Sequence, residues 1–254
     1  MVGGSPKKSL GQHWLGDKAV LSKITSYADL TDTDTVLEIG PGPGTLTKII
    51  QSEAGKVIAV EFDAELAEAL PKNEKLQVIN ADFLQFDLSQ LPIGYKVVAN
   101  IPYYITNPIV EKLITSSNKP EIAVLLVQKE VAERLAAGPG EMSVLSVMAQ
   151  FYADVSTGIV VPPELFTPPP KVDSQVVILK PKKDLPSVDE KLFFRIVKAG
   201  FSERRKKLRS SLAGGLHISK PEAENMLNSA GINPNLRAQD LTINDWCAIL
   251  SVSQ

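Results

Sequence analysis

The stretch V-L-E-I-G-P-G-P-G-T, residues 36–45, decides the fold of this chain. An apolar run comes first, glycines follow at Gly40, Gly42 and Gly44, and a segment with helical periodicity covers residues 46–50. Glycine lets the backbone turn sharply and lie close to a ligand. The order of residue types therefore predicts a buried strand, a tight loop and the start of a helix, the first unit of an α/β sheet.

The residues of this loop favour a ligand that carries no phosphate. The dinucleotide fingerprint G-x-G-x-x-G fails from either Gly40 or Gly42, because threonine stands where its last glycine is required. Pro41 and Pro43 have no backbone N–H, whereas a pyrophosphate requires such donors. We therefore predict that the loop binds S-adenosylmethionine, a nucleotide-like molecule without phosphate. A tight turn that binds no ligand is the alternative.

The composition indicates a sizeable core and no membrane segment. Hydrophobic residues make up 44% of the 254 residues, and no run approaches the roughly 20 apolar residues that a membrane span requires. The N-terminal M-V-G-G-S-P-K-K-S is polar and has no secretory signal pattern. The single cysteine, Cys247, cannot form a disulfide framework, and His13 and His217 lie far apart. We expect a cytoplasmic monomer without a metal site.

Short apolar runs alternate with helical patterns over the first two thirds of the chain. Such alternation predicts a parallel sheet with helices on both faces. The last two predicted strands are separated only by a loop that contains the proline-rich segment 162–171, so we expect them to pair antiparallel at one edge. The predicted strands are 36–39, 57–61, 77–79, 96–99, 123–127, 153–161 and 175–180, and the helices between them include 64–70, 108–115 and 130–137.

From residue 187 onward the pattern is helical, which predicts a small all-helical C-terminal domain. Ser187 and Ser219 are expected N-caps, with Glu190 and Glu222 as their capping-box partners three residues later. We expect a first domain of residues 1–182 and a second of residues 183–254, with helices at 189–200, 203–212, 220–230 and 243–251.

The segment N-I-P-Y, Asn100–Tyr103, follows the fourth predicted strand directly. Ligands of open parallel sheets bind beyond the carboxyl ends of the strands, so we expect this segment and the glycine loop at the same edge. The Asn100 side-chain oxygen and the Ile101 carbonyl can accept both N–H groups of an exocyclic base amine. Pro102 fixes the backbone between them, and Tyr103 offers a face on which a base can stack.

These residue types predict methylation of a base amine. The methyl group of a sulfonium is already an activated electrophile, so catalysis requires mainly the positioning of the amine. A simple turn in which Asn100 caps the following helix is the alternative.

Two carboxylates are placed for the same cofactor. Glu61 ends the second predicted strand, at the distance from Gly40 where an acid can bind both ribose hydroxyls. Asp82 follows the third strand in N-A-D-F, where it can bind an adenine amine with Phe83 beside the ring. Either acid could instead cap a helix.

The net charge of −2 argues against a nucleic-acid partner, but the basic residues are unevenly distributed. Between Lys180 and Gly215, eleven Lys or Arg stand against four Asp or Glu. A solvated charged face is one explanation. We favour phosphate contacts with RNA, which position a substrate without reading its sequence. The expected contacts, all on one predicted helix, are Arg204, Arg205, Lys206, Lys207 and Arg209.

Five segments together are similar to one enzyme family. They are S-L-G-Q-H-W-L (9–15), E-I-G-P-G-P-G (38–44), N-I-P-Y-Y (100–104), P-P-E-L-F-T-P-P-P-K-V-D-S (162–174) and F-S-E-R-R-K-K-L (201–208). In this order they resemble the small-subunit ribosomal RNA adenine dimethyltransferases, the KsgA family. The resemblance implies a Rossmann-like class I methyltransferase domain followed by a small helical domain that contacts RNA.

The resemblance also implies roles for residues that the pattern alone does not explain. It implies that Phe166 closes on the substrate base opposite Tyr103, as aromatic pairs hold flipped bases; read alone, Phe166 could instead plug the edge of the sheet. Many relatives have Asn where this chain has His13, and Phe where it has Trp14. The implied cofactor contacts are His13, Leu15, Gly40, Gly42, Glu61, Asp82, Phe83 and Asn100.

By this resemblance the expected activity is S-adenosylmethionine-dependent dimethylation of two adjacent adenosines near the 3′ end of 16S rRNA, within a precursor of the small ribosomal subunit. A large-subunit rRNA adenine methyltransferase of the macrolide-resistance type is the nearest alternative, because it shares the glycine loop and an N-I-P-Y-like segment. A non-catalytic RNA-binding assembly or transcription factor and a protein-glutamine methyltransferase are alternatives from other classes.

Overall fold

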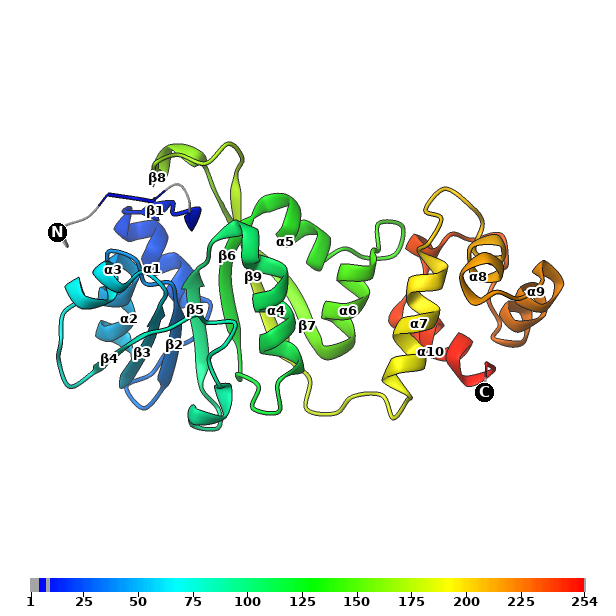
Figure 1. Ribbon diagram of the computed structural model, residues 1–254, viewed down its shortest axis with the longest axis horizontal. Helices are drawn as coiled ribbons and strands as arrows, with labels where there is room; N and C mark the ends of the chain where they lie inside the picture. The colour runs from blue at the N-terminus through cyan, green and yellow to red at the C-terminus, as the bar shows by residue number, and fades with distance from the viewer. Residues whose placement is uncertain (1–4, 8–9, 254) are drawn as a thin grey trace. The chain divides into compact units, whose positions relative to one another are not determined.

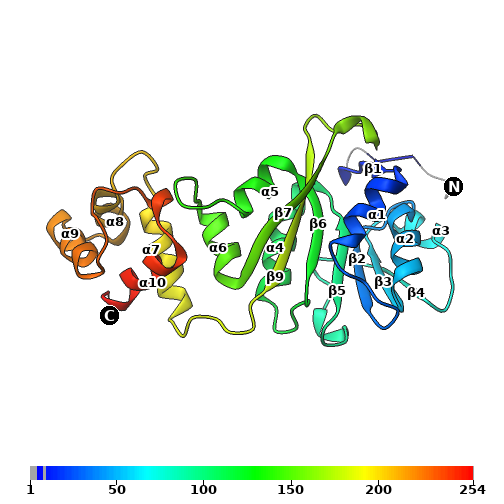
Figure 2. The ribbon, with the colours of Figure 1, turned by 180° about the vertical axis from the view of Figure 1, so that it is seen from behind.

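The computed structural model describes residues 5–7 and 10–253, and Figures 1 and 2 show it from opposite sides. Within these residues, no helix is long and apolar enough to span a membrane. The chain divides into two compact units. The first contains Met1–Glu133 and Ala153–Pro181, and the second contains Arg134–Tyr152 and Lys182–Gln254.

The first unit is built on a seven-stranded sheet in the order β4-β3-β2-β5-β6-β9-β7. The first five strands in this order run parallel, and β9 pairs antiparallel with both β6 and β7. The predicted parallel sheet and its antiparallel edge are therefore confirmed. The strands are β2 (Thr35–Ile39), β3 (Lys56–Glu61), β4 (Leu76–Asn80), β5 (Lys96–Asn100), β6 (Ala123–Gln128), β7 (Ala153–Val161) and β9 (Ser174–Pro181).

Helices cover both faces of this sheet, because its central strands are apolar at nearly every position. Helices α1 and α2 pack on one face through Leu21, Ile24, Leu46 and Ile50. Helix α4 lies over the other face (Figures 1 and 2). The helices are α1 (Lys18–Ser26), α2 (Thr45–Glu53), α3 (Ala64–Ala69), α4 (Thr106–Thr115) and α5 (Lys129–Leu135), which ends where the second unit begins.

The strand order reverses between β2 and β5. After β2 the chain adds β3 and β4 on one side, then returns to pair β5 with the other side of β2, with Leu37 opposite Val97. These two strands end at Ile39 and Asn100, so the glycine loop and the N-I-P-Y segment leave the sheet next to each other. Open α/β sheets bind ligands at such a switch point.

Sequence patterns do not predict a second sheet, which has two short strands. β1 (Trp14–Leu15) pairs antiparallel with β8 (Phe166–Thr167), and Leu15 stands opposite Phe166. A strand of two residues is too short to show alternation. The pairing ties the N-terminal segment to the proline-rich loop.

The second unit consists of helices, as predicted. Helix α7 packs against α6, α8 and α10, and α8 packs against α9. The rings of Phe151 on α6 and Phe193 on α7 have centroids 4.6 Å apart, and Trp246 on α10 is fully buried. The helices are α6 (Val144–Tyr152), α7 (Glu190–Gly200), α8 (Leu208–Leu216), α9 (Lys220–Ser229) and α10 (Ile243–Ser251).

The division between the units falls next to Lys182, but the second unit also contains Arg134–Tyr152, which the sequence analysis assigned to the first domain. The contact of Phe151 with Phe193 explains this membership. Two edge strands separate α6 from α7 in the chain, so no local pattern indicates that they share a core.

One predicted helix of the second unit, 203–212, begins at the wrong residue. Residues 201–205 form turns, and α8 begins only at Leu208. Leu208 and Leu212 are buried by α8, whereas the four consecutive cations before them contain no apolar residue that could pack on the core. Arg204 to Lys207 therefore do not lie on a helix.

The predicted helix caps differ in outcome. Ser219 and Glu222 form the predicted capping box at the start of α9. Ser187 is not a cap, because Asp189 caps α7 by accepting the N–H of Leu192 at 3.0 Å.

Replacing Asp189 by alanine should lower the free energy of unfolding by about 1 kcal/mol, because the N–H of Leu192 loses its acceptor. Ser187→Ala is the matched control and should change it by less than about 0.5 kcal/mol. Urea unfolding followed by circular dichroism measures both values. Equal losses in the two variants would contradict the assignment of the cap.

Candidate active site

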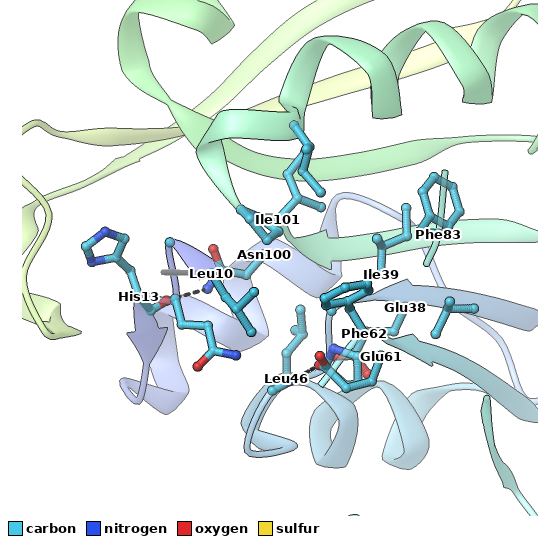
Figure 3. Close-up of a pocket in the computed structure, with 18 of the residues that line it drawn as sticks. Leu10, His13, Glu38, Ile39, Leu46, Glu61, Phe62, Phe83, Asn100 and Ile101 are labelled. Carbon is cyan, nitrogen blue, oxygen red and sulfur yellow. Dashed lines mark hydrogen bonds between the residues drawn. The ribbon is translucent and has the colours of Figure 1, made fainter. Parts of the chain in front are cut away.

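A cavity of about 250 Å³ opens beyond the carboxyl ends of β2, β3, β4 and β5 (Figure 3). The glycine loop, the N-I-P-Y segment and the N-terminal segment 10–15 all line it. The two motifs that the sequence analysis assigned to one edge thus share one cavity. Lining residues that were predicted for the site are His13, Leu15, Gly40, Gly42, Glu61, Asp82, Phe83, Asn100, Ile101, Pro102 and Tyr103.

The glycine loop has no free N–H among its three glycines. Gly40, Gly42 and Gly44 all have positive φ, at 66°, 55° and 79°, a region that favours glycine. The N–H of Gly40 donates to a β3 carbonyl at 2.9 Å, and that of Gly44 donates to the carbonyl of Pro41 at 3.0 Å. The N–H of Gly42 donates to Glu61 Oε2 at 2.9 Å. The loop therefore offers these donors to the protein itself and not to a phosphate.

Glu61 is fixed in place and retains free acceptor capacity. Its Oε2 accepts the N–H of Gly42, and its Oε1 accepts the N–H of Asp63 at 2.8 Å. Burial raises the pKa of the Glu61 carboxyl, and these two hydrogen bonds oppose that rise. A carboxylate has about four acceptor positions, so roughly two remain for a ligand in the cavity.

Glu38 is a second buried acid in the wall of the cavity, and the sequence analysis did not select it. It is 1% exposed, and its Oε2 has no hydrogen-bond partner in the described part of the chain. Burial raises the pKa of Glu38 to about 8, partly offset by the Thr47 hydroxyl nearby. An acid inside an otherwise apolar strand was the signal that could have identified it, because burial of a charge is costly.

The electrostatics of the cavity favour a cation. Glu38, Glu61 and Asp82 line it, whereas no Lys or Arg of the described chain does so. A phosphate group would meet carboxyl groups here and no Lys or Arg side chain of the described residues. Within the described residues, no group of His, Cys, Asp and Glu could hold a metal ion.

Asp82 and Phe83 follow β4 at the edge of the cavity. Asp82 Oδ1 accepts the N–H of Leu84 at 2.9 Å and stabilises a turn; no helix begins there, so Asp82 is not a helix cap. That bond uses one oxygen and leaves the other available. Phe83 is 4% exposed and lies 5.4 Å from the Lys112 ammonium, so only part of its ring can reach a ligand.

The hydrogen bond of Asn100 orients its amide. Its Nδ2 donates to the backbone carbonyl of His13 at 3.1 Å (Figure 3). Because a carbonyl can only accept, the remaining oxygen of this amide is the acceptor that the sequence analysis required. Pro102 follows with extended backbone, φ −60° and ψ 131°, and leads into a short 3-10 turn, Tyr103–Ile105.

Tyr103 is held at its edge and at one face. Its hydroxyl lies 2.5 Å from Ser174 Oγ, at the start of β9, and the two share a hydrogen bond. The imidazole of His13 stacks on the phenol ring, with centroids 5.6 Å apart and 19° between the planes. His13 Nδ1 lies 2.7 Å from the carbonyl of Pro168, so this nitrogen carries the proton. Ser174 was missed because it is distant from Tyr103 in the sequence.

The N-terminal segment is tied to several parts of the first unit. Lys7 Nζ lies 2.9 Å from Asp63 and 2.8 Å from Glu65. Thr45 Oγ1 donates to the Leu15 carbonyl at 2.9 Å. The Trp14 indole Nε1 is buried without a hydrogen-bond partner in the described chain, beside Gly42. Residues 10–15 of this segment form a wall of the cavity.

Phe166 does not stand opposite Tyr103 in this structure. It is 3% exposed, packs in the apolar core with Leu15 and is not among the residues that line the cavity. Side chains alternate along a strand, so the β8 pairing that buries Phe166 leaves Thr167 exposed. The observed position of Phe166 agrees with the alternative interpretation, in which its ring fills the edge of the sheet.

The basic residues selected from the sequence lie in the second unit, and three of the five have partners. Lys206 forms an ion pair with Glu203, Lys207 Nζ donates to Asn235 Oδ1 at 2.9 Å, and Arg209 lies 3.2 Å from Glu224. The exposed residues Arg204 and Arg205 form no ion pair or hydrogen bond with other residues of the described chain.

The sheet order, the antiparallel edge and an acidic cavity at the switch point define a Rossmann-like class I methyltransferase fold. The sequence profile described as "Ribosomal RNA adenine dimethylase" matches residues 4–254. The chain belongs to this family of enzymes.

Curated relatives and solved structures agree with this membership. Relatives from Dehalococcoides mccartyi (strain CBDB1) and Thermosynechococcus vestitus are 43% and 42% identical, over 94% and 97% of this chain and 86% and 96% of their own lengths. Both are called Ribosomal RNA small subunit methyltransferase A. The crystal structure of a dimethyladenosine transferase from Plasmodium falciparum has a TM-score of 0.82 at 28% identity, over 94% of this chain and 96% of that one. The 23S rRNA methyltransferase ErmE has a TM-score of 0.78 at 27% identity, over 95% and 100%.

Replacing Glu38 by glutamine should change how the free energy of unfolding depends on pH. The folded protein keeps the Glu38 proton up to its pKa of about 8, whereas the unfolded chain releases it near 4.5. The folded state thus binds more protons between these values, and the stability contributed by Glu38 falls as the pH rises from about 4.5 to about 8.

Glu38→Gln carries no charge at any pH, so its melting temperature should match that of the wild type near pH 4.5 and exceed it at pH 8.5. Thermal unfolding across this range measures the difference. A difference that does not change with pH would show that burial of this carboxyl is not what destabilises the protein.

Proposed function

We propose that this enzyme uses S-adenosylmethionine to dimethylate the exocyclic amines of two adjacent adenosines near the 3′ end of 16S rRNA. The substrate would be a precursor of the small ribosomal subunit, and the enzyme would act as a cytoplasmic monomer. One observation carries the proposal: a single acidic cavity joins the glycine loop to the N-I-P-Y segment. The small-subunit substrate is supported by the names of the curated relatives.

The residues around the cavity fit this cofactor. Glu61 has free acceptor positions for two ribose hydroxyls, and Asp82 has a free oxygen for an adenine amine. Glu61 and Asp82 favour a positively charged sulfonium, and the engaged glycine N–H groups disfavour phosphate. The unpartnered Trp14 indole N–H is available to an acceptor such as the cofactor carboxylate. When bound, S-adenosylmethionine supplies an activated methyl group.

The enzyme's own residues position the amine of the target adenosine. Asn100 Oδ1 and the Ile101 carbonyl accept the two amine N–H groups and so direct the nitrogen lone pair at the methyl carbon. Tyr103 provides the platform on which the extruded base stacks. The nitrogen would form the new bond to the methyl carbon that the cofactor supplies, the cofactor sulfur would keep the electron pair of the broken bond, and water would take the proton that the nitrogen loses. After the first transfer one N–H remains, so one acceptor still orients the amine.

The choice between the two rRNA substrates is open to direct test. Purified enzyme is incubated with methyl-labelled cofactor and with small or large ribosomal subunits that lack the modification. Label on two adjacent adenosines of the small subunit, located by mass analysis of rRNA fragments, is the expected result. Label confined to the large subunit would reject the small-subunit substrate, and no label in either would reject the proposal.

Asn100→Ala should lower kcat by about two to three powers of ten, a typical loss when one positioned hydrogen-bonding group is removed. The dissociation constant for S-adenosylmethionine should change far less, because the lost acceptor serves the amine. Asn107→Ala, at an exposed position on α4 outside the cavity, is the matched control. Equal losses in rate and cofactor affinity would mean that Asn100 acts only as a cofactor ligand.

Ser174→Ala should raise KM for the RNA substrate about fivefold, because loss of one buried hydrogen bond, worth about 1 kcal/mol, frees the Tyr103 ring. Tyr103→Phe should have a similar effect, and Ser174→Thr should restore activity. Cofactor affinity serves as the internal control and should stay unchanged. If the effects of Ser174→Ala and Tyr103→Phe add in the double variant, the shared hydrogen bond is not the cause.

A further inference from the structure

Helix α7 carries a second set of cations, which the sequence analysis did not single out. Lys191, Arg195 and Lys198 are spaced by four and three residues, so they lie on one face of the helix. All three are exposed, and none forms an ion pair or hydrogen bond with the part of the chain that the structure describes. The neighbouring acid, Glu190, is instead bound by the Tyr152 hydroxyl at 2.5 Å.

These cations line a groove on the surface of the second unit. Its floor includes Phe194, which is half-buried and stacks on Tyr152 with centroids 5.9 Å apart. Helix α8 closes one side, where Gly215 comes so near Ala199 that an added Cβ would lie 2.6 Å from it. The groove is lined by Glu190, Lys191, Phe194, Arg195, Lys198, Ala199, Ser202 and Gly215.

The distribution of charge between the two units favours a nucleic-acid partner for this groove. The second unit has thirteen Lys or Arg against nine Asp or Glu, whereas the first has fourteen against twenty. All six arginines of the chain lie in the second unit. Arginine binds phosphate with a planar, bidentate set of donors, so this segregation is the kind expected of a nucleic-acid surface.

We propose that the α7 face, defined as Lys191, Arg195 and Lys198, binds the phosphate backbone of structured RNA. This inference rests on the proposed function, since it assigns a docking surface for the same rRNA. The three side chains extend over about 10 Å along the helix axis, enough to contact successive phosphates. Such contacts position the RNA without reading its sequence.

The groove suits RNA better than a membrane surface. Phe194 is recessed and is not among the exposed large hydrophobic residues of the described chain. An anionic membrane would call for apolar residues that project beyond the cations. Here the cations form the rim and the apolar surface lies beneath them.

The test is the triple variant K191Q/R195Q/K198Q in the full chain. The probe is unmethylated small-subunit rRNA, and its dissociation constant is measured from 50 to 200 mM KCl. The wild type should bind with a steep salt dependence. The variant should bind at least about tenfold more weakly at the lower salt concentrations, and the slope of log K against log salt should become shallower by about 2 to 3 units.

The matched control is K56Q/K72Q/K220Q, which removes the same charge at exposed positions outside the groove and the cavity. It should retain the wild-type slope within about one unit. Cofactor affinity and melting temperature should be unchanged in both variants, which establishes that they are folded. If the triple variant does not fold, the single variant R195Q replaces it. R195Q should make the slope of log K against log salt shallower by about 1.

An unchanged slope in the α7 variant would overturn this inference and leave the proposed function intact. An α7-dependent slope in a protein that methylates no small-subunit adenosine would support the docking surface and reject the proposed substrate. Unchanged RNA binding together with lost binding to phosphatidylglycerol vesicles would show that the groove serves a membrane and not RNA.

Discussion

The pairing of β2 with β5 is the constraint on which the rest of the site depends. Because these strands are parallel neighbours, the backbone that leaves Ile39 and the backbone that leaves Asn100 enter the same space. The glycine loop and N-I-P-Y, far apart in the sequence, thereby become two walls of one cavity. In this arrangement an electrophile held by one wall can meet a nucleophile held by the other.

Within that cavity, electrostatics selects the ligand. The prolines remove N–H donors from the loop, and the protein itself occupies those of the glycines. The carboxyl groups of Glu61 and Asp82 then make the site attractive to a positive charge. This site is therefore the opposite of a dinucleotide site built on the same kind of turn, where free N–H groups hold a pyrophosphate. We attribute the difference to Pro41, Pro43 and the acidic lining of the cavity.

The sequence predicts the sheet well because its strands are nearly continuous apolar runs separated by helical patterns. Each predicted strand lies within an observed one, and the position of N-I-P-Y followed from general topology. What could not be predicted depends on contacts between distant segments. Examples are the β1–β8 pairing, the Tyr103–Ser174 hydrogen bond and the packing of α6 on α7.

Two differences between prediction and structure have a common cause. The run of cations predicts a helix, but a helix needs apolar residues to pack, and α8 begins where they appear. The resemblance implies that Phe166 closes on the base, and this role stays a prediction, since in this structure the pairing of β8 with β1 turns Phe166 into the core. In both cases packing determined the local structure, and one stretch of sequence does not reveal its packing partners.

The selectivity of the cavity tests the central claim most directly. Titration calorimetry of the protein with S-adenosylmethionine, and in parallel with a nicotinamide dinucleotide, compares a cationic ligand that lacks phosphate with one that contains pyrophosphate. We predict that S-adenosylmethionine binds at least about a hundredfold more tightly, a difference of about 2.7 kcal/mol. Equal affinity for the two ligands, or tighter binding of the dinucleotide, would contradict the account.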